Sequence, residues 1–130
     1  MLCTLQTGTL ALDWLEQRGV VFEANADWQE NSAKPCDTGS PAASLVPLFP
    51  HVDFGCLDPV WPDQTCPRAG RYAYTRGAIL ARGADALDAL RRGPEDLIFV
   101  VSHSGFLRSG VAGWWFFNAD YRIFRFGAIH

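Results

Sequence analysis

The residue types best suited to chemistry lie together where an apolar run ends in the motif Ser102-His103-Ser104-Gly105. The preceding residues 97–101 (LIFVV) are all apolar, which favours a strand buried on both faces, as in a parallel sheet. In open α/β sheets, ligands bind beyond the carboxyl ends of strands, where the next helix offers free backbone N–H groups. The pattern predicts that His103 projects into such a site. The alternative is a turn histidine that is satisfied by its own backbone.

The composition fits one domain that spans residues 1–130, with 48% apolar content available for a core. The formal net charge of −3 gives no general attraction to nucleic acid or to an anionic membrane. No run approaches the roughly 20 apolar residues needed to span a bilayer, and no basic secretory signal precedes Asp13. We therefore expect a soluble, cytoplasmic protein.

The cysteines and histidines show no metal-binding spacing. No pair of cysteines is two residues apart, so a zinc site is not expected, and no motif indicates a cofactor. Cys56 and Cys66 flank one loop and could form a disulfide, but free thiols are the preferred interpretation for an intracellular chain. The residues concerned are Cys3, Cys36, Cys56, Cys66, His51, His103 and His130.

Hydrophobic periodicity and turn residues predict alternating helices and strands, which indicates an α/β fold. The expected architecture is three-layered, with a partly parallel sheet and helices on both faces. The basic residues of the long helix, including Arg82, are expected on a solvated face. The predicted elements are helix 5–17, strand 20–24, an irregular span 25–70 with a short helix at 42–49, helix 71–92, strand 97–101, a helix from Phe106, and strand 121–126.

The predicted sheet has an unsatisfied edge. A strand as apolar as 97–101 needs neighbours on both edges, yet the chain opens on a helix and offers no obvious central strand before it. An uncovered apolar edge invites pairing with another chain. We therefore expect either a homo-oligomer that pairs through the exposed sheet edge or a chain shortened at its amino end.

Together these features resemble the histidine phosphatase superfamily, in particular the phosphoglycerate-mutase-like proteins common in fungi. The similar segments occur in the family's order and cover nearly the whole chain. They are residues 4–7 (TLQT), 27–30 (DWQE), 35–40 (PCDTGS), 100–107 (VVSHSGFL) and 115–122 (WFFNADYR).

The resemblance implies phosphoryl transfer through a phosphohistidine, with the nucleophile supplied by an Arg-His-Gly motif at the end of the first strand. By motif, His103 matches the family's second histidine and Glu30 its proton donor. This chain contains no Arg-His-Gly, and Cys3 stands where the family has an arginine. The resemblance therefore implies a truncated phosphoglycerate-mutase-like fold that lacks its first strand and its nucleophile.

We accordingly expect a protein that has lost phosphohistidine chemistry and uses the remnant pocket on a small organic molecule. His103 and Glu30 would be the catalytic pair, because a histidine and a carboxylate in one pocket can share proton transfer. Glu30 could instead pair with Lys34 or cap a helix. Two other functions stay open: the carboxyl-terminal portion of a phosphoryl-transfer enzyme, and a non-catalytic binding or structural protein. The predicted substrate-binding residues are Ser102, Ser104, Gly105, Trp28 and Trp61.

Overall fold

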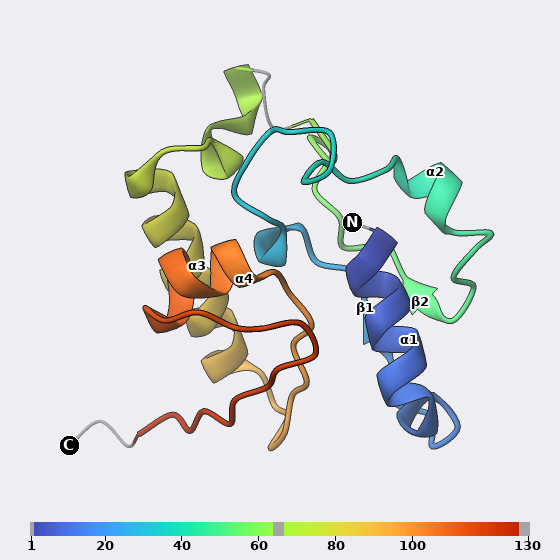
Figure 1. The fold of residues 1–130 in the computed structure, drawn as a ribbon. Helices are drawn as coiled ribbons and strands as arrows, with labels where there is room; N and C mark the ends of the chain where they lie inside the picture. The colour runs from blue at the N-terminus through green and yellow to red at the C-terminus, as the bar shows by residue number, and fades with distance from the viewer. Residues whose placement is uncertain (1, 64–66, 128–130) are drawn as a thin grey trace.

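The computed structural model describes residues 2–63 and 67–127. Most regular elements are helical, and α1, β1 and β2 lie on one side of the molecule with α3 and α4 on the other (Figure 1). In chain order the elements are α1 (Leu2–Glu16), β1 (Phe22–Glu23), the 3-10 helix η1 (Ala26–Trp28), α2 (Ala42–Leu45), β2 (Val52–Asp53), the 3-10 helix η2 (Pro67–Tyr72), α3 (Arg76–Arg92), α4 (Ser104–Phe106) and the π-helix η3 (Leu107–Ala112).

The first helix, α1, confirms the helix predicted at 5–17, although it starts earlier. The turn that follows it contains Gly19, whose φ of 75° lies in the left-handed region that glycine adopts without strain. Leu12 departs from helical geometry, with φ of −124° and ψ of 17°, so α1 is kinked there. A Cβ placed on Gly8 would lie 3.7 Å from Cγ2 of Val101, so α1 rests against the segment before His103.

Strands β1 and β2 form a parallel pair in which Phe22 lies opposite Val52. A hydrogen bond of 2.8 Å from the N–H of Ala24 to the carbonyl of Asp53 extends the pairing by one residue. Strand β1 confirms the strand predicted at 20–24 in a shorter form. Strand β2 lies in the span that the sequence predicted to be irregular, and its two residues are too few to produce a recognisable pattern.

The long helix α3 begins later than the prediction of 71–92 because the Thr75 hydroxyl accepts a hydrogen bond from the N–H of Ala78, at 3.3 Å, and caps the helix. It packs against η3 where two glycines meet. A Cβ on Gly83 would lie only 1.9 Å from the carbonyl oxygen of Gly110, so the two backbones approach as closely as the chain allows. Across the described ranges, no helix is both long and apolar enough to cross a bilayer.

The expected three-layer α/β architecture is wrong, since the described residues contain one sheet of two strands. Residues 97–101 and 121–126, both predicted as strands, have no regular secondary structure. A strand joins a sheet only when another backbone lies about 4.8 Å away, and within the described chain neither segment makes a backbone–backbone hydrogen bond. Leu97 is 72% exposed, so the expectation that this apolar run is buried on both faces is also wrong.

Candidate functional site

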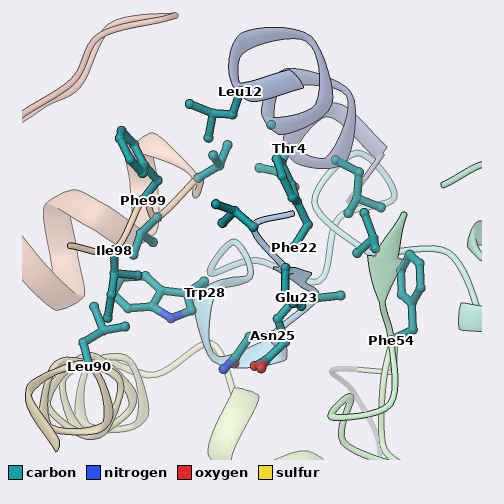
Figure 2. A pocket seen from close by; sticks show the side chains of 18 of the residues that line it. Thr4, Leu12, Phe22, Glu23, Asn25, Trp28, Phe54, Leu90, Ile98 and Phe99 are labelled. Atoms are coloured by element: carbon teal, nitrogen blue, oxygen red, sulfur yellow. The ribbon is translucent and has the colours of Figure 1, made fainter. Parts of the chain in front are cut away.

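A cavity of about 540 Å³ separates β1 from residues 97–101. Figure 2 shows Leu12 of α1, Phe22 of β1, and Ile98 and Phe99 of the 97–101 segment around the same space. The cavity therefore occupies the place where a sheet joining β1 to 97–101 would need another strand. Its volume is in the range of small-molecule sites, and most of its lining is aliphatic or aromatic.

His103 lines this cavity and lies immediately before α4. Its backbone is extended, with φ of −119° and ψ of 144°, and its carbonyl accepts a hydrogen bond of 2.9 Å from the N–H of Leu107. The side chain does not cap the helix, and the residue is only 9% exposed. The prediction of a histidine at the turn between residues 97–101 and a short helix is thus confirmed in its local geometry.

Burial lowers the pKa of His103 to about 4, and the positive charge of Arg82 acts in the same direction. The imidazole is therefore neutral at neutral pH. A neutral imidazole has one N–H donor and one nitrogen acceptor, so it can form a hydrogen bond with either an alcohol or a carbonyl.

Glu30 lies beside the same turn, on the side of α4. Its carboxylate accepts hydrogen bonds from the N–H of Gly105, at 3.2 Å, and from the N–H of Asn31, at 2.9 Å. A Cβ on Gly105 would lie 2.6 Å from Oε1 of Glu30, so the glycine makes the contact possible. Glu30 is not among the residues that line the cavity. Its observed role resembles the helix-capping alternative, because it satisfies a free N–H of α4.

The two predicted serines fasten the turn to neighbouring segments. The Ser102 hydroxyl donates to the carbonyl oxygen of Trp28 at 2.8 Å, and the Ser104 hydroxyl donates to the carbonyl oxygen of Phe116 at 2.8 Å. These bonds hold the residues on both sides of His103. The serines therefore position the imidazole, and neither hydroxyl belongs to the cavity lining.

Both predicted tryptophans line the cavity. The ring of Trp28 meets that of Phe106 edge to face, with centroids 5.9 Å apart. The indole N–H of Trp61 donates to the carbonyl of Ser40 at 2.9 Å, and its ring lies directly over Gly39, where a Cβ would be 1.9 Å away. Each ring is held by a specific neighbour, so the aromatic part of the wall is preformed.

Arg82 is the residue that sequence reasoning missed. It is 2% exposed, so the expectation that it lies on a solvated face is wrong. Its guanidinium donates to the carbonyl of Gln29 at 2.9 Å and to Oδ1 of Asn31 at 3.3 Å, and lies 4.1 Å from the centre of the Phe106 ring. Arg82 thus fixes the segment that carries Glu30. The spacing of Ile79, Arg82 and Ala86 on one helical face was the available signal.

The charges around the cavity are negative. Glu23 and Glu95 are its charged lining residues, and no lysine or arginine of the described chain lines it. Within the described ranges, no three histidine, cysteine, aspartate or glutamate side chains are grouped to hold a metal ion. Cys3, Cys36 and Cys56 are free and exposed, whereas Cys66 lies outside the described residues, as does His130. The cavity is therefore suited to neutral or cationic ligands.

Comparison with known proteins gives no relative for this chain. No family model matches the sequence, and no curated protein or solved structure is significantly similar to it. The resemblance to the histidine phosphatases therefore stays a prediction from the sequence motifs.

Proposed function

We propose that this protein binds a small, largely apolar organic molecule in the cavity between β1 and residues 97–101, where the neutral imidazole of His103 orients it. The observation that carries the proposal is a buried, uncharged histidine in the wall of an apolar cavity of about 540 Å³. Such cavities with one or a few polar groups are typical of small-molecule sites.

His103 is also the group best placed to take a proton from the bound molecule. The neutral imidazole has a free nitrogen lone pair that can accept a proton, although its lowered pKa makes it a weaker base than a free imidazole. Ser102 and Ser104 hold its backbone on both sides. Glu30 serves this proposal as a positioning residue, because its carboxylate is engaged by the backbone of Asn31 and Gly105. The notion of a remnant histidine-phosphatase pocket belongs to the same proposal and is supported by the sequence motifs alone.

Phosphoryl transfer is not the function that the cavity favours. A transferring phosphoryl group needs cations around its oxygens. The described lining provides none, and Glu23 and Glu95 would repel a dianion.

Toluene and phenol provide a matched pair of probes, since they differ by a methyl and a hydroxyl group. The indole N–H signals of Trp28 and Trp61 in proton–nitrogen NMR spectra report on binding, because both rings line the cavity. We expect both probes to shift these signals saturably, with phenol binding roughly five- to tenfold more tightly through His103.

Two variants test the assignment. Gly8→Leu places an aliphatic side chain into the cavity from α1, and it should abolish binding of both probes. His103→Leu should reduce phenol affinity to or below that of toluene, because the phenol hydroxyl loses its partner, and should leave toluene binding in place. The proposal is wrong if both probes bind the Gly8→Leu protein as tightly as they bind the wild-type protein. It is also wrong if phenol still binds more tightly than toluene to the His103→Leu protein.

A further inference from the structure

Two unpaired segments of the described chain carry large apolar side chains at the surface. Residues 97–101 form one wall of the cavity, and residues 121–126 run away from the body of the molecule toward the carboxyl end (Figure 1). Leu97 is 72% exposed and Ile123 is 80% exposed. Neither segment makes a backbone–backbone hydrogen bond within the described ranges, so both leave their peptide groups available for pairing.

The total exposed surface is larger than a compact monomer of this size should have. The chain exposes 8819 Å². A folded monomer of 14.4 kDa is expected to expose about 6,800 Å². The difference, on the order of 2,000 Å², exceeds the roughly 800 Å² per partner that a standard protein interface buries. The structure therefore holds enough unburied surface to supply a stable interface.

The two segments also carry opposite charges. Glu95 and Asp96 directly precede the first segment, while the second contains Arg122 and Arg125. Arg122 is paired with Asp120 within its own segment. Arg125 makes no ion pair in the part of the chain that the structure describes. The charge pattern therefore favours contact between the two segments over contact between two copies of the same segment.

We propose that two copies of this chain form a symmetric dimer in which residues 121–126 of each copy pair as a strand with residues 97–101 of the other. Four of the six residues in 121–126 are aromatic or β-branched, a composition that favours a strand. The resulting dimer is closed and two-fold symmetric, because each copy contributes residues 97–101 to one contact and residues 121–126 to the other. When the two segments pair antiparallel, Arg125 lies near Glu95 and Asp96 at the start of the other segment. This inference does not depend on any ligand in the cavity.

Sedimentation velocity on the full chain over the micromolar range tests the assembly. We expect a dimer of twice 14.4 kDa. A charge-swap pair then tests the pairing. Arg125→Glu alone and the double variant Glu95→Lys with Asp96→Lys should each weaken the homodimer by about tenfold or more, because each places like charges at both symmetric contacts. Mixing the two variant proteins should restore dimers, since in the mixed species every contact again joins opposite charges.

Arg91→Glu is the matched control, because it makes the same charge change at an exposed position of α3. It should dimerise like the wild-type chain. A wild-type protein that stays monomeric through the micromolar range would overturn the proposal. The proposal would also be overturned if each charge-swap variant dimerised as tightly alone as in the mixture, since the dimer would then use other surfaces. Circular dichroism of each variant verifies that a lost dimer is not a lost fold.

Discussion

The carboxylate of Glu30 accepts a hydrogen bond from the backbone N–H of Gly105 at 3.2 Å, although the two residues are 75 positions apart in sequence. This contact joins the segment after η1 to the start of α4, next to His103. It exists only because residue 105 has no Cβ, which would lie 2.6 Å from the Glu30 oxygen.

The Glu30–Gly105 contact predicts that the effect of Gly105→Ala on the free energy of unfolding depends on whether Glu30 is present. Gly105→Ala in the wild-type chain should displace the carboxylate and lower the free energy of unfolding by roughly 1–3 kcal/mol. In a Glu30→Ala background the same change should be neutral or stabilising by up to about 1 kcal/mol, because alanine favours the helix. Urea unfolding of the four proteins measures this. Equal costs in both backgrounds would show that the contact does not exist in solution.

The close approach of α3 and η3 predicts that Gly83→Ala is severely destabilising. The new Cβ would lie 1.9 Å from the carbonyl oxygen of Gly110, and a backbone atom cannot rotate away as a side chain can. We expect Gly83→Ala to lower the free energy of unfolding by about 2–4 kcal/mol, because the added Cβ overpacks a backbone contact. Gly77→Ala on the same helix is the control, since nothing lies within 4 Å of its new Cβ, and it should change stability by less than about 1 kcal/mol. Thermal unfolding that ranks the two variants equally would contradict the packing.

Burial of Arg82 predicts that its removal is costly. Arg82→Ala leaves the Gln29 carbonyl and the Asn31 side chain without their donor and opens a void beside Phe106. The expected loss is about 3–5 kcal/mol. Arg91→Ala, exposed on the same helix, should lie within about 0.5 kcal/mol of wild type. If denaturant unfolding showed that Arg82→Ala and Arg91→Ala lower the free energy of unfolding by the same amount, Arg82 would not be buried in solution.

The depressed pKa of His103 predicts that stability falls in mild acid. The ring titrates near 6.5 when unfolded and at about 4 when folded, so between these values only the unfolded chain takes up the proton. The contribution of His103 to the free energy of unfolding should be fully present above about pH 7.5 and should decrease by roughly 3 kcal/mol as the pH falls to about 4. His103→Gln removes this contribution. The difference between the unfolding curves of the two proteins should therefore vary with pH in this window, and a constant difference would contradict a neutral buried ring.

Local signals predicted the carboxyl end of α3, because Gly93 follows its last residue. The start of α3 was predicted too early, at residue 71, because the capping role of Thr75 was not recognised. The turn at His103 was likewise predictable, since an apolar run gave way abruptly to small polar residues. What these segments share is that the determining contacts lie within a few positions along the chain.

The sheet could not be predicted in the same way. The apolar run 97–101 has the composition of a central strand, but a strand requires a partner, and the described chain places a cavity where that partner would be. The charge of Arg82 predicts an exposed side chain, whereas its spacing from Ile79 and Ala86 places it on the buried face of α3. The hydrogen bond that makes its burial possible goes to the carbonyl of Gln29, 53 positions earlier, and cannot be predicted from local sequence. Glu30 was predicted as a site residue from its motif alone, and its hydrogen bond to Gly105 depends on tertiary packing.

The charge of the cavity predicts that this chain does not hydrolyse phosphate monoesters. With Glu23 and Glu95 in the lining and a neutral His103, nothing there offsets the developing charge on a transferring phosphoryl group. Incubation with p-nitrophenyl phosphate should release nitrophenol no faster than buffer does, and His103→Ala should not alter that rate. Inorganic phosphate should also leave the Trp28 and Trp61 indole signals unshifted while phenol moves them. Turnover that disappears in His103→Ala would mean instead that His103 works beside a cation supplied from outside the described lining, and the cavity would then have to be interpreted as a phosphoryl-transfer site.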